Sequence, residues 1–284
     1  MQQQRGSSLA GRKVLITGAA RGIGAALAER LRGRGAEVAL AGLEPDILEE
    51  VADRLDAPWW PCDVTDRERV DSVVDEAANR LGGLDVVVAN AGVAAQLPIV
   101  GGDPTIFERT MAVNVLGTYN TVRAGGRHIS HADGYAVVVS SLAAAVHVPL
   151  LGAYSASKAA VEALGNTLRQ ELRPSGARVG VAYFAELDTD MTSRGFGTEA
   201  ARKFLGGRSI TRVTPLSVGI DALERGISRR SRTVCAPRYV APILPVRMLA
   251  QPVVELAVRR RTAGALEVAR RESVELTTPQ PEHR

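Results

Sequence analysis

Short apolar runs alternate with longer amphipathic stretches along the first two hundred residues. The runs lack the polar residue at every second position that a half-exposed strand shows, so each is expected to be buried on both faces, as in a parallel sheet. The expected strands are residues 14–16, 37–41, 59–62, 84–89, 136–140 and 179–183. The expected helices are residues 22–34, 46–55, 66–81, 105–127, 153–172 and a further one near 215–229. This order predicts an α/β fold with a mostly parallel, doubly wound (Rossmann-type) central sheet flanked by helices.

No linker or internal repeat divides this pattern, so the 284 residues are expected to form a single such domain over residues 10–238. Residues 1–9 are expected to be a flexible N-terminus. Residues 239–284 are expected to be a basic, helical C-terminal extension whose last stretch, from Thr277, is frayed. Pro58 and Pro61 flank or enter the third expected strand, which predicts that this strand lies at the edge of the sheet.

The amino-acid usage points to a cytoplasmic protein. Cys62 and Cys235 are far apart and form no CxxC pair, which excludes a cysteine-rich zinc module and favours a reducing compartment; no metal is expected. Residues 1–8 contain no apolar core of a signal peptide, and no run of eighteen apolar residues predicts a membrane-spanning helix.

Positive charge is concentrated toward the C-terminus. The chain has a formal net charge of +4, but residues 225–261 hold nine arginines and one acid, Glu255, and so carry +8. This segment predicts either peripheral contact with an anionic membrane or a helix folded over a pocket or a subunit interface. The second is favoured because three prolines interrupt the apolar stretch 240–258. Nucleic-acid binding is not expected, since Tyr239 is the only aromatic residue there.

A glycine-rich turn follows the first expected strand and leads directly into a helix. It reads Thr17-Gly18-Ala19-Ala20-Arg21-Gly22-Ile23-Gly24. Glycines allow a tight turn and let backbone N–H groups approach a phosphate, while the helix N-terminus favours its negative charge. This position in a βαβ unit predicts a dinucleotide site that includes Gly18, Arg21, Gly22, Ile23 and Gly24.

The end of the second expected strand bears on the choice of cofactor. Gly42 stands where an acid that binds the ribose of NAD is expected. Glycine there removes a charge that would repel a 2′-phosphate, and Arg21 is placed to bind one, which favours NADP. The alternative is that Glu44 binds the ribose and the cofactor is NAD.

The chemistry is expected at Tyr154 and Lys158, four residues apart at the start of a helix and therefore on one face. An ammonium beside a phenol lowers the phenol pKa, which suits a general acid/base for an alcohol–carbonyl couple. Ser141 ends a strand at the edge of the sheet where open α/β sheets bind ligands, and is expected to hold the substrate oxygen. Lys158 is one of three lysines in a chain that otherwise uses arginine.

Together these motifs, over roughly residues 10–235, resemble the classical short-chain dehydrogenases/reductases. The resemblance implies that Asp63 and Val64 contact the adenine. It also implies that Asn90, Ala91 and Gly92 close the fourth strand, support the first strand and belong to the cofactor site.

The same resemblance implies the catalytic set. Ser141 and Tyr154, thirteen residues apart, would orient the carbonyl and exchange the proton. Lys158 would bind the nicotinamide ribose, and Asn114 would hold a water that links Lys158 to solvent. The implied function is an NAD(P)-dependent oxidoreductase that transfers a hydride between nicotinamide and a secondary alcohol or ketone. The alternative is a non-catalytic protein of the same fold that senses the nucleotide or binds a partner. A homo-oligomer is expected.

One departure from the family pattern affects the substrate site. Phe184 and Ala185 replace the usual Pro-Gly, while Thr189, the expected carboxamide contact, is retained. The residues expected to face the substrate are predominantly apolar, which predicts a hydrophobic alcohol or ketone. They are Val93, Ala94, residues 143–145, Val148, Pro149, Leu151, Phe184 and Leu187. Residues 192–214, with four glycines, are expected to form a mobile lid.

Overall fold

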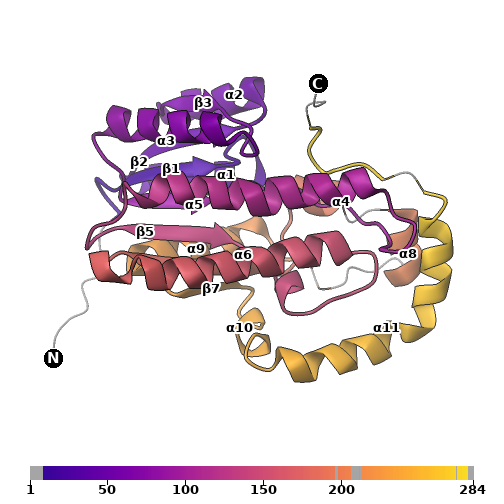
Figure 1. Ribbon diagram of the computed structural model, residues 1–284. Helices are drawn as coiled ribbons and strands as arrows, with labels where there is room; N and C mark the ends of the chain where they lie inside the picture. Colours follow the sequence, from indigo (N-terminus) through magenta and orange to yellow (C-terminus); the bar gives the residue numbers. More distant parts are fainter. Residues whose placement is uncertain (1–8, 196–197, 206–210, 212, 273, 281–284) are drawn as a thin grey trace.

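The computed structural model describes residues 9–195, 198–205, 211, 213–272 and 274–280. Seven strands form one parallel sheet in the order β3–β2–β1–β4–β5–β6–β7 (Figure 1). The strands are β1 Lys13–Thr17, β2 Glu37–Gly42, β3 Trp59–Pro61, β4 Val86–Ala89, β5 Tyr135–Val139, β6 Arg178–Phe184 and β7 Thr233–Ala236. The doubly wound sheet is confirmed, and β3 lies at its edge as its prolines predict. The strand order reverses between β1 and β4, the switch point at which such sheets bind ligands.

Helices cover both faces of the sheet because successive strand residues point to opposite sides. Val14 and Ile16 pack under α1 (Gly22–Gly33), α2 (Pro45–Leu55) and α9 (Leu216–Arg229). Leu15 packs on the other face, in a cluster with residues of α3. The helices on that face, turned toward the viewer in Figure 1, are α3 Arg67–Leu81, α4 Pro104–Met111, α5 Gly117–Gly126 and α6 Gly152–Glu171.

The helix expected over residues 105–127 is not uniform. A π-helical turn, Ala112–Leu116, separates α4 from α5. Thr118 Oγ1 donates to the carbonyl of Asn114 at 2.7 Å within this stretch. Single π-helical turns inside α-helices are frequent at functional sites, and this one contains Asn114.

The seventh strand was not expected from the sequence. β7 pairs in parallel with β6, from Val181 opposite Thr233 to Phe184 opposite Ala236. Its four residues are too few, and too polar at the first position, to stand out as a buried run. Consequently β6 is an interior strand.

The C-terminal extension contains α10 (Val240–Ile243) and α11 (Arg247–Ala269) and then turns back across the molecule. Thr277, expected to begin a frayed tail, is instead buried: its N–H donates to the Ala94 carbonyl, and its Oγ1 accepts from the Ala94 N–H, both at 3.1 Å. At the other terminus, Leu9 packs in the core, and the rest of the segment expected to be flexible lies outside the described residues. Part of the expected lid also lies outside them, between α7 (Asp190–Gly195), α8 (Glu199–Leu205) and α9.

Candidate active site

The residues selected from the sequence converge on one cavity of about 540 Å³ at the carboxyl ends of the strands. Its walls come from the glycine turn, from the loops after β3, β4, β5 and β6, and from α6 and α11. The predicted residues that line it are Gly18, Arg21, Gly22, Ile23, Asp63, Val64, Asn90, Ala91, Gly92, Ser141, Tyr154, Lys158 and Thr189. Gly24 and Asn114 do not line the cavity but lie behind its wall.

The glycine turn is shaped by close approaches between backbones. Gly18 has a φ of +65°, and a Cβ there would lie 2.7 Å from Ala91 Cα. A Cβ at Gly24 would lie 2.1 Å from the Gly18 carbonyl oxygen, so Gly24 lets α1 pack against the turn. Asn90 Nδ2 donates to the carbonyls of Thr17 and Gly18 at 3.0 Å. α1 begins at this turn without a side-chain cap, and its N-terminal N–H groups fit a bound pyrophosphate.

The turn also carries a charged cluster. Arg21 Nε donates to Glu44 at 2.8 Å, and Arg21 Nη1 donates to Asp190 at 3.1 Å. Gly42 is buried at the end of β2, against Leu48. Arg21 therefore stands at the cavity wall already paired with two carboxylates, an arrangement that the sequence did not indicate.

Asp63 is held by three hydrogen bonds. Its Oδ1 accepts from the N–H and the hydroxyl of Thr65, at 2.9 and 2.8 Å. Its Oδ2 accepts from Arg109 Nη2 at 3.2 Å. Arg109, buried on α4, was missed by the sequence analysis, because nothing in its local pattern separates it from a surface arginine.

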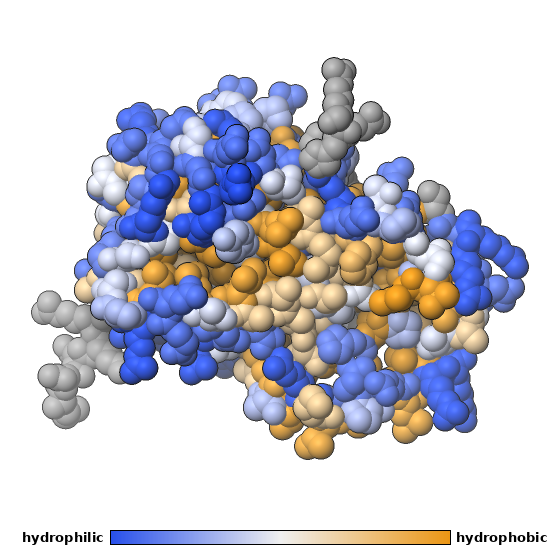
Figure 2. Space-filling model, in the orientation of Figure 1, coloured by the Kyte–Doolittle hydropathy of each residue, from blue (hydrophilic) through white to orange (hydrophobic). Residues whose placement is uncertain are grey.

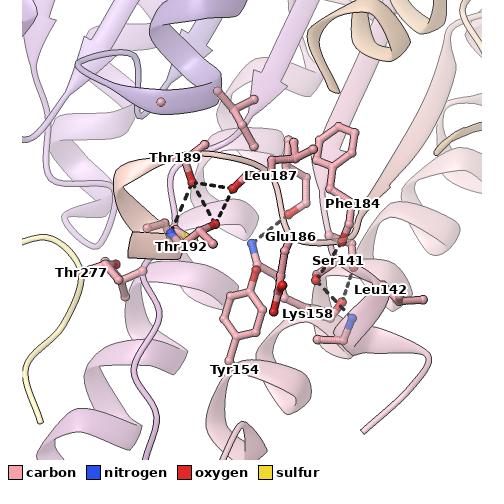
Figure 3. A pocket seen from close by; sticks show the side chains of 18 of the residues that line it. Ser141, Leu142, Tyr154, Lys158, Phe184, Glu186, Leu187, Thr189, Thr192 and Thr277 are labelled. Atoms are coloured by element: carbon pink, nitrogen blue, oxygen red, sulfur yellow. Dashed lines mark hydrogen bonds between the residues drawn. The ribbon is translucent and has the colours of Figure 1, made fainter. Parts of the chain in front are cut away.

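Ser141, Tyr154 and Lys158 meet in the cavity (Figure 3). Ser141 lies in extended conformation after β5; its Oγ donates to the Phe184 carbonyl at 3.2 Å and accepts from the Ala143 N–H at 3.1 Å. Burial raises the pKa of Tyr154 above its ordinary value, partly offset by a hydrogen bond with Ser141.

Lys158 projects from α6 beside Tyr154. Its Nζ donates to the Val139 carbonyl at 2.9 Å and lies 5.6 Å from the centre of the Tyr154 ring. Burial lowers the pKa of Lys158 to about 8. The expectation that the Lys158 ammonium lowers the phenol pKa is not met, because burial raises the pKa of Tyr154 in the structure.

Asn114 joins two parts of this site. Its Oδ1 accepts from the Val93 N–H at 2.8 Å, and its Nδ2 donates to the Val93 carbonyl and to Ser157 Oγ, both at 2.9 Å. A Cβ at Gly92 would lie 3.2 Å from Asn114 Oδ1 and 3.3 Å from Lys158 Nζ, so Gly92 keeps the space beside both groups open.

The remaining walls are largely apolar. Among the residues expected to face the substrate, Val93, Ala143, Val148, Leu151, Phe184 and Leu187 line the cavity. Ala94, Ala144, Ala145 and Pro149 do not. Phe184 is also part of the core under α9 and presents its carbonyl to Ser141. Thr189 lies over the glycine turn: its Cβ and Cγ2 would each be 3.9 Å from a Cβ placed on Gly22. The inner side of α11 also lines the cavity, as the favoured expectation of a helix over the pocket implies, and so does Thr277, which no sequence motif indicated.

Comparison with known proteins agrees with this geometry. The family model described as short chain dehydrogenase matches residues 12–202. Glycine betaine reductase ATRR of Emericella nidulans is 36% identical over 202 residues, which are 69% of this chain but only 16% of that protein. L-2,3-butanediol dehydrogenase of Corynebacterium glutamicum is 33% identical over 196 residues, 63% of this chain and 76% of that protein.

Two solved structures that contain a bound cofactor are similar to this chain. A short chain dehydrogenase from Burkholderia cenocepacia in complex with NADP has a TM-score of 0.71 at 27% identity, covering 80% of this chain and 97% of that one. One from Mycobacterium paratuberculosis bound to NAD has a TM-score of 0.69 at 29% identity, with the same coverage. The family model matches two thirds of the chain, and the motif residues line one cavity. The chain therefore belongs to the short-chain dehydrogenases/reductases, which are oxidoreductases that use nicotinamide cofactors.

Proposed function

We propose that this protein interconverts an apolar secondary alcohol and the corresponding ketone, using a nicotinamide cofactor. The observation that carries the proposal is the convergence of Ser141, Tyr154 and Lys158 on one apolar cavity beside an uncapped helix N-terminus. When bound, the nicotinamide supplies or accepts the hydride. The protein holds the substrate oxygen and moves its proton.

Tyr154 is assigned the role of general acid and base at the substrate oxygen. Its hydrogen bond with Ser141 supports this role, because two hydroxyl groups that meet in the cavity can both bond to one carbonyl oxygen. The Lys158 ammonium is close enough to favour the phenolate when Tyr154 gives up its proton. Lys158 is also assigned the role of binding the nicotinamide ribose.

Asn114 is assigned a role in the proton relay, in which it would hold a water that links Lys158 to solvent. Its side-chain amide bonds to Val93 and Ser157, so its first effect is to hold the backbone at Val93, next to Gly92, against α6. The relay water is expected in the space beside Gly92 that Asn114 Oδ1 and Lys158 Nζ share. An Asn114→Ala variant is expected to lose turnover more than cofactor affinity.

The cofactor is proposed to lie along the cavity from Asp63 to Lys158. Asp63 and Val64 would contact the adenine, and the turn from Gly18 to Gly24 would bind the pyrophosphate. Asn90, Ala91 and Gly92 would border the ribose, and Thr189 the carboxamide. We favour NADP, because β2 ends in Gly42 and not in an acid, and because Arg21 lies at the cavity wall. Glu44, which pairs with Arg21, is the basis for the alternative, NAD.

The proposed substrate is hydrophobic. Val148, Leu151 and Leu187 line the cavity, and α11 adds Val254 and Val258. Such walls favour an apolar body around one oxygen that faces the tyrosine. The relative from Corynebacterium glutamicum, named for 2,3-butanediol, is consistent with a secondary alcohol.

The test is a cofactor-coupled screen of hydrophobic alcohols and ketones with the wild type and Tyr154→Phe. Loss of the phenolic proton is expected to lower kcat by about 10²-fold or more, while the affinity for the cofactor, measured by fluorescence titration, stays within about twofold. Tyr239→Phe, which also removes one phenol at the cavity, is the matched control and is expected to keep its turnover. Equal turnover of Tyr154→Phe and wild type would contradict the assignment. Tight cofactor binding without any turnover would favour the nucleotide-sensing alternative.

A further inference from the structure

The helix α11 and the residue before it expose an apolar surface that faces away from the cavity. On α11, Met248 is 83% exposed, Leu249 75%, Val253 68% and Leu256 73%. These positions, with Pro252, fall on one side of a helix of 3.6 residues per turn. Val246, between the two helices, is also exposed. We call Val246, Met248, Leu249, Val253 and Leu256 the outer face. Figure 2 shows apolar side chains along the lower edge of the molecule, where Figure 1 places α10 and α11.

The opposite side of α11 is already engaged. Arg247 Nη1 donates to both Glu162 oxygens on α6 at 3.0 Å. Gln251 accepts from the His147 N–H at 2.9 Å and donates to the His147 carbonyl at 3.2 Å. Ala250, Val254, Ala257 and Val258 line the cavity from this side. Because these contacts fix the rotation of α11, the outer face cannot turn inward without losing them.

The prolines do not interrupt this surface. Pro252 lies inside α11, which continues as one helix from Arg247 to Ala269. A helix over the pocket was the favoured prediction, because proline was expected to break the apolar face. The structure contains that helix and also has an apolar face on its outer side, so the two predictions do not exclude each other.

The positive charge beside the outer face indicates which kind of partner this face binds. Arg259 and Arg260 follow on the same side of α11, Arg261 adjoins them, and all three are exposed. Within the part of the chain that the structure describes, none of the three makes an ion pair. From Arg238 to Arg261 the chain holds five arginines and one acid, Glu255, a net charge of +4. Two copies paired through this face would bring two such positive surfaces together, whereas an anionic lipid surface offers opposite charge.

We propose that the outer face, with Arg259, Arg260 and Arg261, docks this protein on the surface of an anionic lipid bilayer. The apolar side chains enter the boundary between headgroups and acyl chains, and the arginines bind lipid phosphates. This is peripheral contact: among the described residues, the structure has no helix with the length and apolar content needed to cross a bilayer. Since α11 also forms a wall of the cavity, docking brings the proposed site for a hydrophobic substrate next to the lipid.

The full-length protein is tested by co-sedimentation with vesicles of phosphatidylcholine alone and with about one third phosphatidylglycerol. Binding is expected only to the anionic vesicles and is expected to weaken as salt is raised. Two variants remove separate halves of the proposed contact: Leu249→Glu with Leu256→Glu, and Arg259→Gln with Arg260→Gln and Arg261→Gln. Each is expected to lower the vesicle partition coefficient by about tenfold or more.

The matched controls change equally exposed residues elsewhere. Ile99→Glu with Val100→Glu replaces two side chains that are each 76% exposed, and Arg54→Gln with Arg67→Gln removes two surface charges. Both are expected to bind vesicles as the wild type does. Wild-type protein that stays in the supernatant, or outer-face variants that bind like the controls, would overturn the proposal. So would a fall in solution mass of Leu249→Glu with Leu256→Glu, since it would assign the face to a second copy. Binding is measured without substrate, so it is independent of the proposed reaction.

Discussion

Lys158 is an ionisable group placed where its charge is disfavoured. It is 4% exposed, and burial lowers its pKa to about 8. Burial acts on Tyr154 in the opposite direction and raises its pKa, so both shifts favour the neutral side chain. A protonated Tyr154 is ready to donate to a carbonyl oxygen, whereas oxidation of an alcohol first requires loss of that proton. Oxidation is therefore expected to gain more from alkaline pH than reduction does.

The shift of Lys158 makes stability depend on pH. The unfolded chain holds this proton up to the ordinary pKa of 10.5, whereas the folded protein releases it near 8, so between these values the unfolded state binds more protons. The free energy of unfolding should thus rise with pH from 8 to 10.5, with a contribution from Lys158 of about 3 kcal/mol. Urea denaturation of wild type and Lys158→Met at pH 7 and pH 10 checks this, and the rise should be smaller in the variant. Lys203→Met, at an exposed position, is the control; an equal rise in all three proteins would refute the buried charge.

Arg21 is the residue on which the proposed cofactor preference depends. Glu44 neutralises it, and a 2′-phosphate would have to compete with that carboxylate. Glu44→Gln is expected to tighten NADPH relative to NADH by about tenfold, because it removes the competing charge and leaves Arg21 in place. Fluorescence titration of both cofactors measures the ratio. Glu50→Gln, exposed on α2, the helix that Glu44 precedes, should leave the ratio unchanged. A wild type that prefers NADH would contradict the proposal.

At the scale of elements, the helices are positioned by glycines that let them approach the sheet. Gly125 and Gly126 are neighbours at the end of α5 but differ in surroundings. A Cβ at Gly125 would lie 2.8 Å from Val87 Cγ2 on β4, whereas a Cβ at Gly126 would meet no atom within 4 Å. Gly125→Ala should lower the free energy of unfolding by about 1–3 kcal/mol through overpacking, and Gly126→Ala should raise it by about 0.5 kcal/mol. Chemical denaturation of the pair measures this difference, and equal effects would show that α5 does not depend on this contact.

The elements also show what could be predicted from sequence. Six strands, the edge position of β3 and the helix that carries Tyr154 follow from local apolar patterns and motif spacing, and the structure contains them. β7 was missed because a four-residue strand has too little pattern of its own. The hydrogen bonds of Thr277 with Ala94, and of Arg109 with Asp63, join residues far apart in the chain. No local pattern encodes such contacts, since they arise only when the fold brings the partners together.

At the scale of the whole molecule, exposed apolar residues of the described chain gather in separate regions, and two of these regions matter for association. One is the outer face; the other covers α4 and α5, where Leu116 is 56% exposed, Tyr119 46% and Phe107 41%. Figure 2 shows apolar side chains across the centre of the face that α4, α5 and α6 form in Figure 1. Exposed apolar patches of this kind mark association sites, and this one lacks the cluster of arginines that follows the outer face. We therefore expect copies of the chain to pair through α4 and α5.

This assignment predicts that the two regions respond separately to mutation. Leu116→Asp with Tyr119→Asp should lower the solution mass measured by light scattering, because a buried carboxylate on each copy opposes pairing. The same variant should still bind anionic vesicles. Leu249→Glu with Leu256→Glu should have the reverse effect: its solution mass should equal that of the wild type, and its binding to anionic vesicles should be lost. If Leu116→Asp with Tyr119→Asp kept the mass of the wild type, α4 and α5 would not be the interface. If it lost both properties, vesicle binding would depend on assembly, because only two or more outer faces together would hold the protein on the lipid.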